Sequence, residues 1–285
     1  MKGLILAGGT GSRLWPNTKA TNKHLLPVYD KPLIYYPLAT LMLAGISDIA
    51  IVSSPDHMPG FKSLFAESQK LGLNLVFIEQ KTPAGLPQGI SLAQKFLGED
   101  SFAMILGDNI FHGVGMGKSL INLEHLSGAK IFCYNVANPE NFGVAQITEN
   151  RIVKLDEKPK NPNTNLAITG LYVFDNDAAS LAAPLKPSAR GELEITDLLR
   201  CYLEKDSLEF EILPRGTAWL DTGTSKSLLD AGNYVRIIEE RQGSKVACLE
   251  EISWRNSWIS NAELESISSE CISPDYSDYL MALLR

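Results

Sequence analysis

The chain has 285 residues, 45% of them hydrophobic, and is therefore long enough to bury the core of one large domain. Its formal net charge of -7 provides no overall positive field, which argues against a nucleic-acid polymer or an anionic membrane as a partner. A mononucleotide is not excluded, because backbone N–H groups and a few cations are enough to hold it.

The N-terminal apolar stretch is too short for a signal sequence or a membrane span. The cysteines are widely spaced and form no C-x-x-C pair, so we interpret them as reduced packing residues rather than zinc ligands: Cys133, Cys201, Cys248 and Cys271. We therefore expect a soluble, cytoplasmic protein.

Continuous apolar runs in the first half of the chain predict strands buried on both faces, at residues 3–7, 48–52, 74–78 and 102–106. Residues 33–44 and 91–97 have the apolar spacing of helices that cover a sheet. The alternation predicts βαβ units and a largely parallel sheet. Ligands of such sheets bind beyond the carboxyl ends of the strands.

The second half is less regular, with short predicted strands at residues 130–136, 144–147, 151–155 and 170–174. We expect an inserted mixed region over the sheet that supplies a second wall for a cleft. From about Ser225 the pattern becomes helical, and a polar tail with Trp254 and Trp258 follows. This part is interpreted as a helical appendage that contacts other subunits.

A glycine-rich turn, residues 8–11, follows the first predicted strand and precedes Arg13 and Lys23. Glycines let backbone N–H groups approach phosphate oxygens, and the two cations suit a triphosphate. Leu14 stands where a dinucleotide fingerprint needs its third glycine, and no Gly-Lys-Ser/Thr follows as in a P-loop. The segment predicts a phosphate cradle, with an ordinary glycine-rich turn as the alternative.

Two acidic residues, Asp108 and Asp221, each follow an apolar segment. A single Asp after a strand is usually a turn former or a helix cap, but two carboxylates converging from separate strands suit a Mg²⁺ ion that bridges protein and phosphates. Glu157 and Lys158 have the right chemistry for sugar hydroxyls and a sugar phosphate, although a surface Glu-Lys pair is commonly just solvated. Residues 191–197 read as a helix start in which Thr196 has an ordinary role.

The sequence resembles the bacterial glucose-1-phosphate thymidylyltransferases over nearly its whole length. The similarity lies in segments that follow one another in the family's order, at residues 2–14, 23–27, 35–38, 106–109, 157–159, 191–197 and 219–224. The resemblance implies an α/β fold, a Rossmann-like three-layer sandwich with a mostly parallel central sheet, an inserted sugar-binding region and C-terminal helices. It implies one nucleotidyltransferase domain over 1–285, with a catalytic core at 1–224 and a helical oligomerisation region at 225–285.

The resemblance also implies substrates and roles: dTTP and glucose 1-phosphate as substrates, Mg²⁺ as cofactor and a homotetramer as the assembly. The nucleotide would be held by Leu6, Gly8, Gly9, Thr10, Gly11, Gln80 and Gly85. The phosphates would contact Arg13 and Lys23, and the metal would be bound by Asp108 and Asp221. The sugar phosphate would be lined by Gly143, Glu157, Lys158 and Gly170. The family often has a second nucleotide-like site for feedback inhibition, in regions that correspond to residues 110–115 and 250–255, with ordinary packing between subunits as the alternative for these segments.

The sequence departs from the family pattern at a few positions near these sites. Ala84 and Pro87 stand where the family usually has Asp and Ala, and His24 replaces the usual Gln. Phe142 stands where Tyr is common, and Gln146 where Glu is common. Nucleotide and sugar preference are therefore predicted less sharply than the fold.

Three alternatives follow from these departures and from the fold. One is a pyrophosphorylase that uses UTP or CTP, or another hexose 1-phosphate. Another is a glycosyltransferase of similar architecture, since fold does not fix function, but Asp108 is followed by Asn109 and Ile110 rather than by the Asp-x-Asp motif of that class. The last is a catalytically silent regulatory subunit, which should have lost a phosphate cation or a metal carboxylate.

Overall fold

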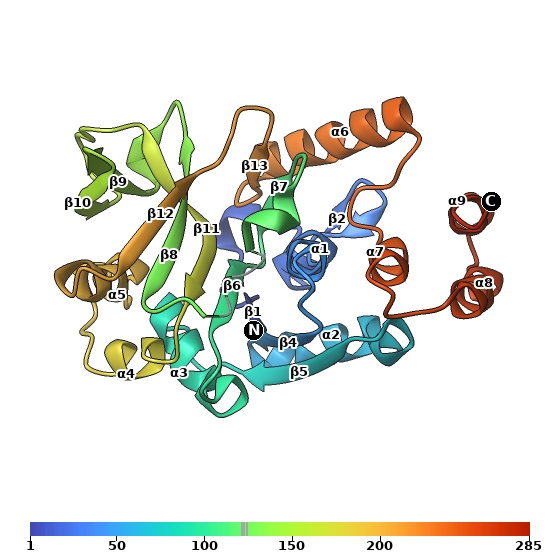
Figure 1. The fold of residues 1–285 in the computed structure, drawn as a ribbon, viewed down its shortest axis with the longest axis horizontal. Helices are drawn as coiled ribbons and strands as arrows, with labels where there is room; N and C mark the ends of the chain where they lie inside the picture. Colours follow the sequence, from blue (N-terminus) through green and yellow to red (C-terminus); the bar gives the residue numbers. More distant parts are fainter. Residues whose placement is uncertain (121–122, 124) are drawn as a thin grey trace.

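The computed structural model describes residues 1–120, 123 and 125–285 and shows a twisted central sheet with helices on both faces (Figure 1). The sheet has the strand order β10-β9-β11-β6-β1-β4-β5, and β8 and β12 extend it beside β11. Four mutually parallel strands form its first half: β1 (Lys2–Leu6), β4 (Asp48–Ser53), β5 (Asn74–Glu79) and β6 (Phe102–Leu106). The strands predicted from the apolar runs are confirmed.

Two hydrophobic cores lie on opposite faces of these strands, because successive side chains alternate between the faces. In β1, Ile5 packs into the core under α1 (Tyr35–Leu43) and α2 (Met58–Leu64). Leu4 and Leu6 pack on the other face, which is covered by α3 (Leu86–Leu97), α4 (Ala178–Ala182) and α5 (Ile195–Glu204). Helix, sheet and helix form the expected three-layer sandwich.

The inserted region continues the central sheet, which corrects the expectation that it lies over the sheet. It contains β8 (Ala129–Asn135), β9 (Gly143–Thr148), β10 (Arg151–Glu157), β11 (Leu166–Phe174) and β12 (Leu208–Ile212). β11 pairs antiparallel with β6, so the insert adds strands directly beside the parallel half. The second wall of the cleft is therefore the outer part of the same sheet.

A small two-stranded ribbon stands off the main sheet and joins distant parts of the chain. β7 (Asn109–His112) pairs antiparallel with β13 (Ala218–Asp221), and Asp221 lies opposite Asn109. The backbone N–H of Thr222 then donates to the carbonyl of Asp108 at 3.1 Å. This pairing places the two acidic residues next to each other.

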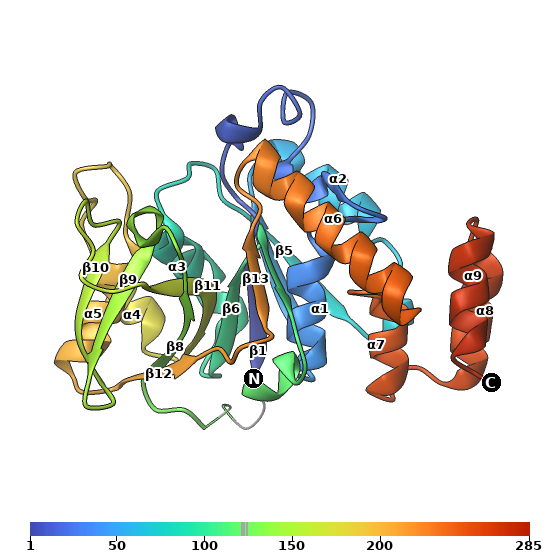
Figure 2. The same cartoon turned by 90° about the horizontal axis from the view of Figure 1, so that it is seen from above.

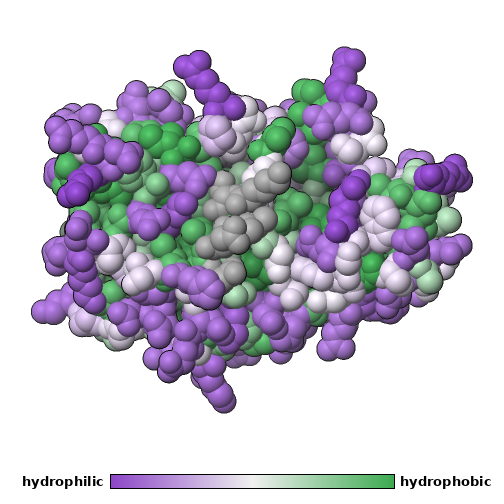
Figure 3. Space-filling view, viewed as in Figure 1, coloured by the Kyte–Doolittle hydropathy of each residue, from purple (hydrophilic) through white to green (hydrophobic). Residues whose placement is uncertain are grey.

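Four helices follow the ribbon: α6 (Ser225–Gln242), α7 (Leu249–Arg255), α8 (Asn261–Glu270) and α9 (Pro274–Ala282). α6 begins at Ser225, as predicted, because Thr224 and Ser227 form a capping box. Figure 1 shows α8 and α9 as a pair at the end of the molecule, away from the sheet. None of the helices in the described part of the chain combines the length and hydropathy that a transmembrane segment requires. Polar residues are spread over the face shown in Figure 3, with apolar areas between them.

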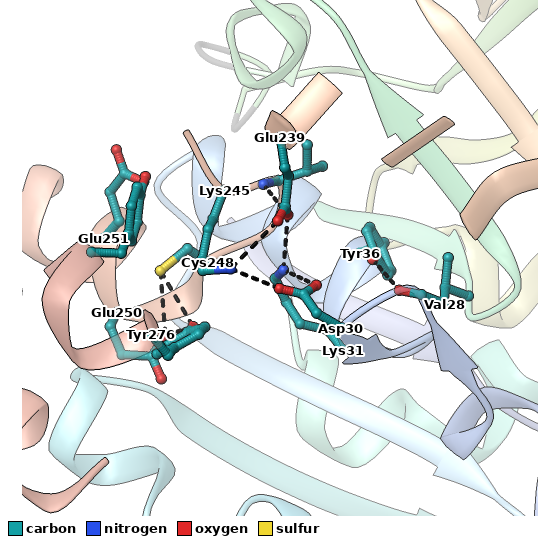
Figure 4. A network of polar contacts seen from close by, with 12 residues as sticks. Val28, Asp30, Lys31, Tyr36, Glu239, Lys245, Cys248, Glu250, Glu251 and Tyr276 are labelled. Atoms are coloured by element: carbon teal, nitrogen blue, oxygen red, sulfur yellow. Dashed lines mark hydrogen bonds and ion pairs between the residues drawn. The ribbon is translucent and has the colours of Figure 1, made fainter. Parts of the chain in front are cut away.

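A buried charge network ties α6 to the hairpin of β2 (Pro27–Val28) and β3 (Lys31–Pro32) (Figure 4). The Lys31 Nζ atom pairs with Glu239 at 3.0 Å and also with Asp30, and the Lys31 side chain is only 3% exposed. Lys245 completes the network, 2.9 Å from Asp30 and 3.4 Å from Glu239. The network fixes the hairpin that directly follows Lys23.

The network predicts a large difference between two neighbouring glutamates of α6. Glu239→Ala removes one of the two carboxylates that pair with the buried Lys31 ammonium and also the acceptor of the Val246 backbone N–H, and we expect it to lower the free energy of unfolding by about 2–3 kcal/mol. Glu240→Ala removes an exposed ion pair with Arg236 and should cost no more than about 1 kcal/mol. Urea unfolding measures both variants. Equal losses would contradict the role given to the buried network.

Candidate active site

The loop after β1 carries the predicted phosphate cradle. A side chain at position 8 would place its Cβ 2.5 Å from Oε1 of Gln80 and would displace that amide, and Gly9 has a φ of +93°, which favours glycine. A short helix, Ser12–Leu14, follows and carries Arg13. Figure 2 shows this loop and the start of α6 at the same end of the molecule.

Lys23 is held in place by its neighbour Asn22. The Asn22 side chain accepts a hydrogen bond from the backbone N–H of His24 at 2.8 Å and donates to the carbonyl of Ala7 at 3.2 Å. It therefore joins the start of the helix Lys23–Leu25 to the end of β1. Lys23 forms an ion pair with Asp108, with the two side chains 15% and 13% exposed.

The carboxylate of Asp108 is strongly biased toward its ionised form. Burial by itself would raise the pKa of Asp108, but the charge of Lys23 and hydrogen bonds from Lys23 and Asn109 outweigh it and hold the pKa well below its usual range. The Asn109 amide donates to Asp108 Oδ1 at 2.9 Å. Asp108 is therefore an anion at neutral pH.

Asp221 has the opposite bias. Burial and the charge of Asp108 raise the pKa of Asp221, although Arg13 and the backbone N–H of Gly223 oppose the shift. A Cβ at Gly223 would lie 2.6 Å from an Arg13 guanidinium nitrogen and 3.1 Å from Asp221 Oδ1, so Arg13 packs against this glycine beside Asp221. The like charges of the two carboxylates favour a cation between them.

The donor set fits Mg²⁺. In the part of the chain that the structure describes, no cluster of three or more His, Cys, Asp or Glu side chains forms a complete metal cage. Mg²⁺ commonly binds through one or two carboxylates and completes its shell with water and substrate phosphates. Asp108 and Asp221 supply that number of carboxylates and line one cavity together.

A cavity of about 180 Å³ opens beside the glycine loop. It is lined by most of the residues expected to hold the nucleotide and its phosphates, namely Leu6, Gly8, Gly9, Lys23, Gln80 and Gly85, together with Asp108. Thr10 and Gly11 belong to the same loop but lie outside the lining of this cavity. The lining combines the backbone of the glycines, the side-chain amide of Gln80 and the ammonium of Lys23, which are groups that can bind a nucleotide and its phosphates.

Ala84 and Pro87, which depart from the family pattern, lie in the segment beside this cavity but outside its lining. Gln88 accepts hydrogen bonds from the Ala84 backbone N–H at 2.9 Å and from the Gln80 amide at 2.8 Å. Pro87 lies in the first turn of α3, where its missing N–H costs no hydrogen bond. Gln80 is therefore oriented without a side chain from Ala84, and Gln88, which lies outside the lining of the cavity, positions Gln80, a contact that the sequence reasoning missed.

His24 also lines this cavity and is completely buried. Burial, together with the charge of Lys23, lowers the pKa of His24 to about 3, so the ring is neutral at physiological pH. Its ring packs against Gly107, where a Cβ would lie 2.7 Å from His24 Cδ2. The substitution thus places a neutral aromatic ring where the family pattern has an amide.

A second cavity, of about 190 Å³, adjoins the first one and shares Leu86, Leu106 and Asp108 with it. It is lined by the residues expected around the sugar phosphate and the metal, namely Arg13, Asp108, Asp221, Gly143, Glu157, Lys158 and Gly170. Ligands bound in the two cavities would therefore both lie next to Asp108. The residues that the sequence predicted for this site thus line one cavity. Their individual roles stay predictions.

Glu157 is the centre of a polar cluster at the far side of the second cavity. The Thr196 hydroxyl donates to Glu157 Oε2 at 3.1 Å, and Arg190 donates to Oε1 at 3.1 Å. Burial and the charge of Glu194 raise the pKa of Glu157, against the opposing charges of Arg190 and Lys158. α5 begins at Ile195, as the helix-start pattern predicted, but Thr196 also lines the site, which the sequence reasoning missed along with Arg190, and Glu194 belongs to the acidic segment that it weighed only as a helix start.

Asn109 and Trp219 form part of the wall of the second cavity, next to the two carboxylates that also line it. Asn109 Oδ1 accepts hydrogen bonds from the Trp219 indole at 2.6 Å and from the backbone N–H of Gly170 at 3.2 Å. A side chain at Gly170 would lie 2.5 Å from that oxygen, which explains the glycine there. The Phe142 ring packs on Trp219 with its centroid 5.0 Å away, so the hydroxyl of the family's Tyr is replaced by apolar packing.

A third cavity lies between the end of β7 and α7. Residues of both segments singled out for a second nucleotide-like site line it, including Phe111, His112, Gly113, Glu251 and Arg255. Its function stays a prediction of the resemblance.

Comparison with known proteins agrees with this geometry. The family model described as nucleotidyl transferase matches residues 2–236. A glucose-1-phosphate thymidylyltransferase of Neisseria meningitidis is 48% identical over 287 residues, which cover 100% of both chains. One from Mycobacterium tuberculosis is 48% identical and covers 100% of this chain and 99% of its own.

A solved structure from Bacillus anthracis, provisionally named a glucose-1-phosphate thymidylyltransferase, is 42% identical, with a TM-score of 0.77. The match covers 83% of this chain and 95% of that one. With a matching family model, full-length relatives and the same fold, this chain belongs to the nucleotidyl transferase family, and its full-length similarity is to the glucose-1-phosphate thymidylyltransferases.

Proposed function

We propose that this chain is a glucose-1-phosphate thymidylyltransferase, which converts dTTP and glucose 1-phosphate into dTDP-glucose and pyrophosphate. The observation that carries the proposal is the 48% identity to enzymes of that name over the full chain. Two adjoining cavities that share Asp108 support it, because the reaction needs a nucleotide and a sugar phosphate side by side.

The chemistry is a displacement at the α-phosphorus of the nucleotide. An oxygen of the sugar 1-phosphate forms a bond to this phosphorus, and the bond between the phosphorus and the oxygen that bridges to the β-phosphate breaks. The electron pair leaves with pyrophosphate. Since the nucleophile is already an anion, no general base is required, and catalysis rests on positioning and charge neutralisation.

Arg13 and Lys23 are the cations proposed to neutralise the phosphates. The two cavities adjoin at Asp108, and we call this place the junction. Lys23 lines the nucleotide cavity and Arg13 the sugar cavity, so one cation reaches the junction from each cavity. A Mg²⁺ ion held by Asp108 and Asp221 would add positive charge on the phosphoryl oxygens at that junction. On the opposite side, Glu157 is placed to accept hydrogen bonds from sugar hydroxyls and Lys158 to pair with the sugar phosphate.

The site residues distinguish the proposed enzyme from a silent regulatory subunit, and the similarity to known enzymes distinguishes it from a pyrophosphorylase for another nucleotide. A silent regulatory subunit should lack a phosphate cation or a metal carboxylate, yet Arg13, Lys23, Asp108 and Asp221 are all present in the two cavities. A pyrophosphorylase for UTP or CTP would differ in its contacts to the base and to the ribose 2′-hydroxyl, which dTTP lacks. The hydrogen bond from Gln80 to Gln88 does not distinguish dTTP from UTP, so the preference for dTTP rests on the identity to the thymidylyltransferases.

The assembly and the domain division are proposed on the family resemblance. Residues 1–224 form the catalytic core of a single domain, and residues 225–285 pack subunits into a homotetramer. The exposed apolar side chains of α6 support this, since Leu229 and Ile237 are 66% and 49% exposed. The cytoplasmic location is likewise kept as a prediction.

Pyrophosphate release tests the proposal directly. The enzyme is assayed with glucose 1-phosphate and Mg²⁺ against dTTP, UTP, CTP, ATP and GTP, with EDTA added in a parallel series. We expect turnover to be fastest with dTTP and to be abolished by EDTA. Turnover with every nucleotide except dTTP would overturn the substrate assignment, and turnover that EDTA leaves unchanged would overturn the metal assignment.

The charges at the junction predict a loss of turnover without a loss of folding. Asp108→Asn and Arg13→Ala should each reduce kcat by roughly 100-fold or more. Asp108→Asn weakens binding of the metal that would stabilise the negative charge of the transition state, and Arg13→Ala removes a cation that neutralises the same charge. The unfolding midpoint of each variant shows whether the fold is intact.

Two surface substitutions serve as matched controls for this experiment. Lys19→Ala removes an exposed cation from the same loop as Arg13, and Asp100→Asn neutralises a surface carboxylate that pairs with Lys2. Both should retain wild-type kcat within about twofold. A folded Asp108→Asn variant with a near wild-type rate would show that this carboxylate holds no essential metal.

A further inference from the structure

Three buried polar side chains next to the nucleotide cavity form one hydrogen-bonded cluster with Asn22 at its centre. Asn22, His24 and Ser53 are 1%, 0% and 0% exposed. The Asn22 amide donates to the Ala7 carbonyl at 3.2 Å and to the Ser53 hydroxyl at 3.4 Å. Ser53, the last residue of β4, donates to the same Ala7 carbonyl at 2.9 Å. The cluster therefore joins the ends of two parallel strands to the segment that carries Lys23.

His24 is attached twice to one oxygen of Asn22. Asn22 Oδ1 accepts a hydrogen bond from the His24 backbone N–H at 2.8 Å and lies 2.6 Å from the ring Nδ1. The amide nitrogen of Asn22 must face the Ala7 carbonyl, which only accepts, so the oxygen is the atom that faces His24. Because an amide oxygen only accepts, Nδ1 carries the ring proton and donates it to this bond. The histidine that replaces the family's Gln thus has a specific partner in this chain.

The His24 ring also contacts the strand end that carries Asp108. A Cβ at Gly107 would lie 2.7 Å from His24 Cδ2 and 2.9 Å from Nε2, so the ring fills the space that this glycine leaves. Lys23 lies between Asn22 and His24 in the chain, and its ammonium pairs with Asp108 and lines the nucleotide cavity. The backbone of Lys23 is therefore anchored on both sides, against the end of β1 and against the residue before Asp108.

We propose that Asn22 and His24 are positioning residues that act as a pair and hold Lys23 where its ammonium meets the nucleotide phosphates. This assignment rests on the function proposed above. Neither side chain has to contact the nucleotide, because both act through the backbone of Lys23. A lysine side chain is long and flexible, so a fixed backbone restricts where its ammonium can lie.

The pair has a consequence that a purely structural cluster would not have. When Asn22 is replaced, Ser53 still donates to the Ala7 carbonyl, so the glycine loop keeps one of its anchors. The loss should then reach the nucleotide through Lys23 alone. Two substitutions that act through one side chain are not additive, so the effect should disappear once Lys23 is removed.

Calorimetric titration of dTTP into the enzyme, with Mg²⁺ and without glucose 1-phosphate, tests the assignment under conditions in which no transfer can occur. Asn22→Ala should weaken dTTP binding by roughly 10-fold. His24→Phe, which keeps a ring but lacks the Nδ1 donor, should weaken it by about three- to tenfold. In a Lys23→Ala background, each substitution should change the dTTP affinity by less than about twofold. KM for glucose 1-phosphate should stay within about twofold of wild type in both single variants.

Ser53→Ala is the matched control, because it removes a hydrogen bond from the same cluster without releasing His24. It should lower the unfolding midpoint and leave the dTTP affinity within about twofold of wild type. His24→Phe leaves the Asn22 side chain and its bond to the backbone in place, so it tests the pair even where Asn22→Ala folds poorly.

Three results would overturn the assignment: an unchanged dTTP affinity in either folded variant, the same loss in the Lys23→Ala background, or an equal loss in Ser53→Ala. Wild-type pyrophosphate release from dTTP and glucose 1-phosphate is measured alongside. Its absence would overturn the proposed function itself, whereas normal wild-type turnover beside unaffected variants overturns the role of the pair alone.

Discussion

The site depends on the pairing of two short strands, β7 and β13, outside the main sheet. This ribbon holds Asp221 opposite Asn109, and the backbone and side chain of Thr222 both donate to the carbonyl of Asp108, at 3.1 and 2.7 Å. Two carboxylates are thus forced together at the junction of two cavities. The repulsion between them is offset by Lys23 and Arg13, and a divalent cation would offset it further.

Contacts elsewhere in the molecule hold α6, the β2–β3 hairpin and Lys23 in fixed positions relative to the two carboxylates. α6 begins directly after the Asp221 strand and carries Glu239, which pairs with Lys31 at 3.0 Å. Lys31 belongs to the hairpin that follows Lys23, and Lys23 returns to Asp108. The chain thereby closes a ring of contacts around the junction. We infer that this ring, rather than any single contact, gives the site the preorganisation that a charge-neutralising mechanism needs.

Sequence reasoning predicted the parallel half of the sheet because strands buried on both faces leave continuous apolar runs. It also placed Asp108 and Asp221 together, since carboxyl ends of strands gather ligand groups. It missed β7, whose length of 4 residues carries too little pattern, and the partners of Glu157. Arg190 and Thr196 reach that carboxylate from 33 and 39 residues away, a contact that only the folded chain reveals. The resemblance, not periodicity, supplied the substrates.

The central claim is that Asp108 and Asp221 together bind one divalent cation between the two cavities. Calorimetric titration of Mn²⁺ into the enzyme with bound dTTP, for the wild type and for Asp221→Asn, tests it most directly. The account predicts one site in the wild type and an affinity reduced by roughly 10- to 100-fold in Asp221→Asn, since a divalent cation in this shell has few protein ligands to lose. Equal Mn²⁺ affinity in both proteins would show that the ribbon brings the two carboxylates together for a purpose other than holding the metal.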